Sequence, residues 1–261
     1  MRERMLGAAE AFTRKAGTLC SMCRSSLLMT RDGQDPRHFY HAERLRYLEL
    51  RSALNWKENL VVYDIGASVG SFAAFVARLR SVAAVYCFEP IPAVFEQLVQ
   101  NSRSQPKVQC FRLALGDSTE HRLFHVNEFS PSSSLLPLQA AHEKEFPHAR
   151  ITRSEEVQVL TLSQAARELS LLPPDFIKVD VQGFEDHVVR GGEDVFRRSR
   201  FCMLELSLTS LYENSALIVE MTELMSTLGF KLIGILDRKV VGQSRRILQL
   251  DGIFENEQIL G

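Results

Sequence analysis

A carboxylate stands beside a turn with few side chains in the segment VVYDIGASVG, which runs from Val61 to Gly70. Gly66 and Gly70 would let the backbone approach a ligand closely and turn sharply into a helix. Asp64 adds a negative charge at the same place. Glu89 ends the next apolar run, 19 residues after Gly70, where an acid can accept hydrogen bonds from both hydroxyls of a ribose. The pattern predicts a nucleoside site.

Two classes of nucleoside cofactor use such a turn, and charge separates them. A dinucleotide places its diphosphate at the helix N-terminus, where free N–H groups and the helix dipole favour anions. Asp64 would repel that diphosphate, and the Gly-x-x-x-Gly spacing differs from the Gly-x-Gly-x-x-Gly of dinucleotide sites. S-adenosylmethionine has no phosphate, and its ammonium and sulfonium groups both gain from a nearby carboxylate. The turn therefore favours S-adenosylmethionine, with an NAD(P)-dependent oxidoreductase as the alternative.

Three further acids are expected at the ligand-facing edge of the sheet and are the candidate catalytic residues. Asp180 and Glu185 lie around the fourth parallel strand, and Glu205 ends the fifth. We expect Asp180 to take part in catalysis or to hold the amino group of the cofactor. The alternatives are a helix cap for Asp180 and a favourable charge at a helix N-terminus for Glu185. Asp180 and Glu205 could instead hold a divalent cation such as Mg²⁺, although the sequence identifies no third ligand. His187 falls within the following helix. It could act as a general base, but we expect a surface or hydrogen-bonded histidine.

The predicted strands and helices that position these acids alternate along the chain. From Leu60 onward, short apolar runs alternate with amphipathic stretches, which predicts strands covered on both faces by crossover helices. The sequence therefore favours a doubly wound α/β fold with a mostly parallel sheet. Ligands bind such sheets beyond the carboxyl ends of the strands, where these acids lie. The predicted strands are LVVYDI, AAVYCF, VQCFRLAL, DFIKVDV and FCMLELSL, and the predicted helices cover residues 71–80, 93–102, 184–198 and 215–228.

Two segments depart from this alternation of strands and helices. Residues 119–160 are expected to form a loop-rich insertion. Its Ser133 and Ser134 could donate hydrogen bonds to the cofactor or the acceptor, or could only serve the turn itself. Residues 230–236 and 247–254 are expected to form two adjacent antiparallel strands that end the sheet.

Residues 1–55 are expected to form a helical arm or cap, with one helix from about Phe39 to Leu54, and residues 56–261 to form the cofactor-binding domain. A transit peptide or a helix lying on a membrane is the alternative for the first 31 residues. A zinc site is a further alternative, because two thiols and two imidazoles lie near finger spacing. The short spacing of the two histidines argues against zinc. The four residues are Cys20, Cys23, His38 and His41.

The composition limits the partners. Hydrophobic residues make up 45% of the 261 residues, which suffices for one sizeable core. The 31 basic and 32 acidic residues balance to a formal charge of -1, so no overall attraction to nucleic acid or to an anionic membrane is expected. No apolar stretch approaches the roughly 20 residues that span a bilayer, and we expect a cytoplasmic protein that acts on a small molecule or glycan. A homo-oligomer is left open.

Six motifs in order resemble the FkbM family of S-adenosylmethionine-dependent methyltransferases. The likeness covers about three quarters of the chain, from Val61 to Phe254. The motifs are DIGASVG, which includes Ala67, FEP at 88–90, ALGD at 114–117, the serines at 132–134, IKVDVQGFE at 177–185 and QLDGIF at 249–254.

The resemblance implies the class I methyltransferase fold, a seven-stranded Rossmann-like sheet with its last strand inserted antiparallel. It also implies methylation of an oxygen, typically a hydroxyl of a sugar or secondary metabolite, and it places Pro90 and Leu115 as apolar walls for adenine. Gln182 departs from the family pattern because an acid is common there, and Ser163 departs likewise. A catalytically silent module that only binds the cofactor is the remaining alternative.

Overall fold

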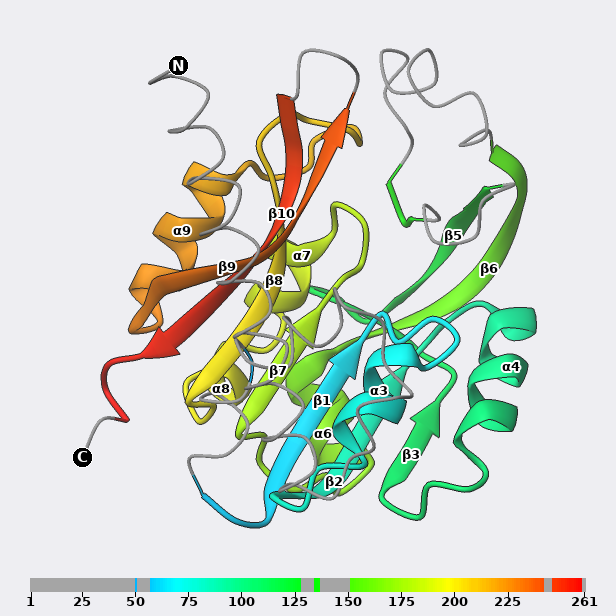
Figure 1. The fold of residues 1–261 in the computed structure, drawn as a ribbon. Coiled ribbons are helices and arrows are strands. Elements are labelled where there is room, and N and C mark those ends of the chain that lie inside the picture. Colours follow the sequence, from blue (N-terminus) through cyan, green and yellow to red (C-terminus); the bar gives the residue numbers. More distant parts are fainter. Residues whose placement is uncertain (1–49, 51–56, 128–133, 137–150, 242–245, 260–261) are drawn as a thin grey trace, which may run out of the picture.

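A seven-stranded sheet forms the centre of the protein (Figure 1), in the order β3-β2-β1-β7-β8-β10-β9. The structure is a computed structural model and describes residues 50, 57–127, 134–136, 151–241 and 246–259. The strands of this sheet are β1 (Leu60–Ile65), β2 (Val82–Phe88), β3 (Val108–Phe111), β7 (Phe176–Val179), β8 (Phe201–Ser207), β9 (Phe230–Val241) and β10 (Arg246–Asn256).

The direction of the strands confirms the predicted sheet. Strands β3, β2, β1, β7 and β8 pair in parallel, and β10 pairs antiparallel with β8 on one side and with β9 on the other. The parallel strands carry near-continuous apolar runs because helices cover both of their faces. Their carboxyl ends therefore meet along one edge, next to the hairpin formed by β9 and β10.

Alternate residues of each strand enter two separate cores. Val61, Tyr63 and Ile65 of β1 pack with four helices, α6 (Leu162–Glu168), α7 (Glu185–Arg190), α8 (Glu193–Phe196) and α9 (Ile218–Thr227). Leu60 and Val62 pack on the opposite face, with α3 (Ser71–Val76) and α4 (Pro92–Ser102). Successive side chains of a strand point to opposite faces, so the neighbour of each core residue belongs to the other layer.

A second, smaller sheet corrects two predictions. The run VQCFRLAL, expected as one strand, forms β3 in the central sheet and then β4 (Ala114–Gly116) in a three-stranded sheet of order β4-β6-β5. The expected loop-rich insertion is also wrong at both ends, because β5 (Glu120–Asn127) and β6 (Ile151–Thr161) form an antiparallel ladder. This small sheet lies beside the central one (Figure 1).

The helix predicted over 184–198 is two helices, α7 and α8, with Gly191 and Gly192 between them. A Cβ on Gly191 would lie 1.8 Å from the carbonyl oxygen of Gly116. The chain therefore passes close to β4 at a point where only glycine fits. The helical arm and the zinc alternative fall on residues 1–55, of which the structure describes only Leu50.

Candidate cofactor and acceptor site

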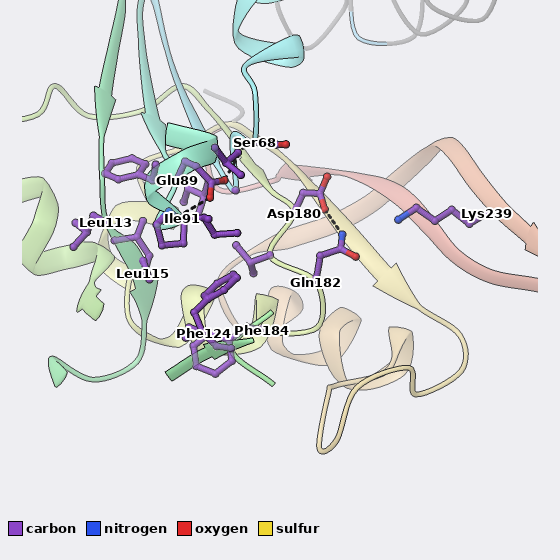
Figure 2. A pocket seen from close by; sticks show the side chains of 18 residues that line it. Ser68, Glu89, Ile91, Leu113, Leu115, Phe124, Asp180, Gln182, Phe184 and Lys239 are labelled. Carbon is purple, nitrogen blue, oxygen red and sulfur yellow. Dashed lines mark hydrogen bonds between the residues drawn. The ribbon is translucent and has the colours of Figure 1, made fainter. Parts of the chain in front are cut away.

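A cavity of about 160 Å³ lies beyond the carboxyl ends of β1, β2 and β7, where the sequence places the nucleoside. Figure 2 shows Glu89, Ile91, Leu113 and Leu115 on one side of this first cavity and Asp180 on the other. Its walls are mostly apolar, with acids on both sides. Such a lining suits a flat apolar base joined to polar or cationic groups.

The glycine turn after β1 borders this cavity. Gly66 adopts a φ of 76°, which disfavours other residues, and a Cβ there would lie 1.9 Å from the carbonyl oxygen of Asp180. Gly70, with a φ of 89°, is the N-cap of α3. A Cβ on Gly70 would meet Leu98 of α4 at 2.7 Å, so this glycine shapes the turn without lining the cavity. The turn is built so that two strand ends approach each other closely.

Glu89 lies where the ribose was predicted. Its side chain lines the first cavity and is 5% exposed as a residue. One carboxylate oxygen accepts a hydrogen bond from the Ser68 amide at 3.1 Å, and the other accepts one from the Ile91 amide at 2.9 Å. Burial raises the pKa of Glu89 to about 7, against the opposing effect of these two hydrogen bonds. Each oxygen keeps further acceptor capacity for a ligand hydroxyl.

Asp180 lies at the junction of this cavity with a second one. The second cavity, of about 490 Å³, is lined by Asp180, Phe72, Phe75 and Lys178 among others, and it shares Gly66 and Ser68 with the first. A ligand in one cavity therefore meets a ligand in the other beside this carboxylate. This shared position is the geometry that a two-substrate reaction requires.

The carboxylate of Asp180 is held ionised. Its Oδ1 accepts a hydrogen bond from Gln182 Nε2 at 2.6 Å, and its Oδ2 lies 3.5 Å from Lys178 Nζ. Burial acts to raise the pKa of Asp180, but the charges of Lys178 and Lys239 and the bond from Gln182 hold it below its usual value. The side chain is nevertheless 38% exposed, so a ligand can reach it.

Asp64 does not lie where it was expected. Its side chain is fully buried and lines neither cavity. Residues of β1 alternate between the two cores, so Asp64 faces α3, where it pairs with Lys178 at 3.2 Å. Burial raises the pKa of Asp64, with Lys178 acting in the opposite direction. The acid of the glycine turn is thus connected to the cavities only through its neighbours.

Glu205 and Glu185, the other two predicted catalytic acids, also line neither cavity. Glu205 accepts hydrogen bonds from Gln182 Nε2 at 2.9 Å, Gln249 Nε2 at 2.7 Å and Lys239 Nζ at 2.5 Å. Burial raises its pKa to about 7. Glu205 therefore anchors the amide that contacts Asp180.

Glu185 fixes the loop between β7 and α7. Its two carboxylate oxygens accept the backbone amides of Val181 and Gly183, at 3.0 and 2.9 Å. Burial, reinforced by the charge of Glu205, raises the pKa of Glu185 to about 8. The same loop holds Gln182 at a φ of 57°. The structure thus gives Glu185 and Glu205 supporting positions around one exposed acid.

The remaining predicted residues divide into two groups. Pro90 and Leu115 line the first cavity, and Ala67 lines the second. Ser134 is 1% exposed and donates to the carbonyl oxygen of Gln182 at 2.7 Å, so it connects the insertion to the loop after β7. Ser133 lies outside the described residues.

His187 lines neither cavity, although its stacking partner Phe184 lines the first. Its Nδ1 lies 2.8 Å from Asp117 Oδ2, and its ring stacks on Phe184 at 4.0 Å between centroids. The side chain is 28% exposed. It is partly exposed and has polar and aromatic partners, as expected from its place inside the helix.

Two lysines of the site were missed in the sequence. Lys178 lies within the apolar run of β7 and reaches Asp64, Asp180 and the carbonyl oxygen of Gly66. Lys239 extends from β9 towards the first cavity (Figure 2). A lysine inside an otherwise apolar strand was the available signal, because such a charge is buried only with a partner.

Metal binding was left open, and the described residues contain no group of three or more His, Cys, Asp or Glu side chains placed to hold an ion. Glu205, one of the two expected ligands, has both oxygens occupied by donors. The described residues also contain no helix that is long and apolar enough to cross a membrane.

The fold and the site together define a class I, S-adenosylmethionine-dependent methyltransferase. The sheet order and the antiparallel β10 give this fold, and the first cavity offers acids where a diphosphate would need cationic or N–H donors. The chain belongs to the methyltransferase FkbM domain family, which matches residues 64–232. The oxidoreductase alternative is therefore wrong.

Three known proteins are similar to this chain. The 2-O-methyltransferase NoeI of Sinorhizobium fredii is 28% identical over 192 residues, 71% of this chain and 78% of NoeI. The hexuronic acid methyltransferase AglP of Haloferax volcanii is 24% identical over 178 residues, 64% of this chain and 67% of AglP. The structure of methyltransferase FkbM from Methylobacillus flagellatus has 15% identity and a TM-score of 0.48, covering 80% of this chain and 47% of that one.

Proposed function

We propose that this enzyme transfers the methyl group of S-adenosylmethionine to a hydroxyl oxygen of a carbohydrate. The observation that carries the proposal is the position of Asp180, whose carboxylate borders both cavities. The similarity to a 2-O-methyltransferase and to a hexuronic acid methyltransferase supports oxygen as the acceptor atom and a sugar as the acceptor class.

The first cavity is proposed to hold the adenosine half of the cofactor. Leu115 and Ile91 would contact the base, and Glu89 would accept hydrogen bonds from the ribose hydroxyls. The methionine end would then cross Gly66 towards Asp180. When bound, the cofactor supplies a methyl group made electrophilic by the adjacent positive sulfur.

The second cavity is proposed to receive the acceptor. Its rings Phe72 and Phe75 offer apolar surfaces for the C–H face of a sugar, and its acids Asp180 and Asp251 can accept hydrogen bonds from hydroxyls. The cavity volume of about 490 Å³ falls within the usual range for ligand pockets.

Asp180 is proposed to orient the acceptor and to take its proton. An ionised carboxylate accepts a hydrogen bond from the hydroxyl and directs a lone pair of the oxygen towards the methyl carbon. As the O–C bond forms, the S–C bond breaks with its electron pair remaining on sulfur, and the hydroxyl proton passes to Asp180. Proton acceptance of this kind contributes about 10²–10⁴-fold in enzymes, and holding the two reactants in line adds a further acceleration.

The test is a labelled-methyl assay with the purified full chain. S-adenosylmethionine carrying a labelled methyl group is incubated with neutral glycosides, uronic acid glycosides, hydroxylated secondary metabolites, peptides and tRNA. Labelled product only with the glycosides, with the label located as an O-methyl ether, supports the proposal. Label in peptide or tRNA, or cofactor binding without any product across the panel, contradicts it. The latter result favours the cofactor-binding module.

A further inference from the structure

Lys178 has a buried ammonium group between two carboxylates. The residue is 9% exposed, and its Nζ lies 3.2 Å from Asp64 Oδ1, 3.5 Å from Asp180 Oδ2 and 3.4 Å from the carbonyl oxygen of Gly66. The ammonium group also lies over the ring of Phe72, 5.7 Å from its centroid. One side chain thus contacts both strand ends and the turn between them.

The register of the sheet explains this position. Asp64 of β1 pairs directly with Lys178 of the parallel strand β7. Asp180 comes two residues later and, because side chains alternate along a strand, projects to the same face as Lys178. The lysine therefore lies across from one acid and next to the other along the chain.

The charges of this trio sum to one negative charge. Lys178 is the cation paired with the buried Asp64, and this pair offsets part of the burial that raises the pKa of Asp64. The other carboxylates and lysines that interact with the trio are Glu205 on β8, Lys239 on β9, Asp251 on β10, Glu89 after β2 and Glu185 on α7. Lys239 and Glu205 pair with each other at 2.5 Å.

We propose that Lys178 is a positioning residue that neutralises Asp64 and leaves Asp180 as the free negative charge beside the sulfonium of the cofactor. The trio thereby favours S-adenosylmethionine, which carries a net positive charge, over S-adenosylhomocysteine, whose sulfur is neutral. This inference rests on the proposed function only for the bound position of the sulfur. It assigns discrimination between substrate and product to the net charge of three residues.

A double-mutant cycle on the full chain tests the charge balance. The variants are Asp64→Asn, Lys178→Met and the double variant, with trio charges of 0, -2 and -1 against -1 in the wild type. Affinities for S-adenosylmethionine and S-adenosylhomocysteine are measured by calorimetry at pH 8, and folding is checked by thermal unfolding. Lys231→Met is the matched control, because Lys231 has a side chain 68% exposed and pairs with Glu257 at the surface.

The expected result is compensation. Lys178→Met brings the trio to -2 and should raise the preference for S-adenosylmethionine over S-adenosylhomocysteine about tenfold. Asp64→Asn should lower the preference for S-adenosylmethionine over S-adenosylhomocysteine. The double variant restores the net charge and should recover that preference to within about threefold of the wild type. Lys231→Met should change neither affinity.

Two results overturn the inference. A preference in the double variant as low as that of Asp64→Asn, or equal changes in the two affinities in every variant, would mean that Lys178 only fills space. If Lys178→Met fails to fold, comparing Asp64→Asn with the double variant still decides, because the double variant must show the higher preference for S-adenosylmethionine. A wild type that binds neither ligand rejects the proposed function itself, and this inference with it.

Discussion

The two faces of the central sheet are built from alternate residues of the same strands, yet they differ in chemistry. On the face that packs against α6 to α9, the residues of β1, β7 and β8 are apolar and include Tyr63, Ile177 and Leu204. On the face towards α3, the apolar core gives way near the carboxyl ends to charged side chains, among them Asp64 and Lys178.

The difference separates stability from ligand binding along each strand. An apolar face stabilises the fold through the area it removes from water. Buried charges oppose folding unless they are paired, so a face that keeps them needs a different explanation. The buried charged side chains of the α3 face each lie near Asp180 or the glycine turn. We infer that the α3 face sets the charge of the site and the opposite face supports it.

Asp180→Asn tests whether the charged face of the sheet takes part in the reaction. The substitution keeps the shape of the side chain but removes the negative charge and the proton acceptor, so turnover should fall about 10²–10⁴-fold. Methyl transfer under saturating substrates measures the effect, and unfolding should show little loss of stability. Glu193→Gln is the matched control, since Glu193 has a side chain 48% exposed on α8. Normal turnover in Asp180→Asn would contradict the proposal that Asp180 takes part in the reaction.

Two adjacent residues of β8 test whether the two faces of the sheet have separate roles. Leu204 is fully buried on the apolar face, whereas Met203 is 6% exposed and lines the second cavity. Leu204→Ala should lower the free energy of unfolding by about 2–5 kcal/mol through the cavity it creates, without changing acceptor KM in the folded enzyme. Met203→Ala should destabilise less and raise acceptor KM. Chemical denaturation measures the free energy of unfolding, and steady-state kinetics measure acceptor KM. Equal changes of both quantities in the two variants would contradict separate roles for the two faces.

The sequence predicted much of the α/β framework because apolar runs and strand ends can be read locally. Glu89 and Asp180 lie at the expected edge of the sheet, since each comes at or near the end of a predicted strand. Their roles toward cofactor and acceptor stay predictions. The orientation of Asp64 could not be read in this way. Whether an acid inside a strand faces a ligand or a covering helix depends on the helix that packs there, and α3 with Phe72 covers this one.

The small sheet was missed for another physical reason. Strand β6 has the alternating buried pair Val157 and Val159, but the charged Glu155 continues the same row and the exposed Glu156 lies on the other side, so few apolar residues mark the pattern. Strand β5 has Phe124 buried and Leu123 60% exposed. A strand with one exposed face and few apolar residues resembles a loop in composition. Only pairing with a distant strand reveals it.

Glu89→Gln tests the nucleoside end of the site. The amide keeps the size of the side chain but loses the charge that ribose hydroxyls would meet. Replacing a charge-assisted hydrogen bond in this way should weaken S-adenosylmethionine binding by about 1–3 kcal/mol. Calorimetry at pH 8 measures the change. Glu120→Gln, at a side chain 43% exposed, should leave binding unchanged. Equal S-adenosylmethionine affinities in the wild type and both variants would mean that the nucleoside does not contact Glu89.

The pH dependence of cofactor binding gives the smallest expected effect. Burial raises the pKa of Glu89 to about 7, so the free enzyme holds a proton on this acid below that pH. A ligand that prefers the ionised carboxylate must displace the proton, and its affinity therefore falls as the pH decreases through 7. Between pH 8 and pH 6 the affinity for S-adenosylmethionine should drop about tenfold, whereas Glu89→Gln should show a flat profile over the same range. A wild-type decline that persists in Glu89→Gln would assign the titration to another acid of the α3 face, with Glu205, whose pKa is also raised to about 7, as the next to test.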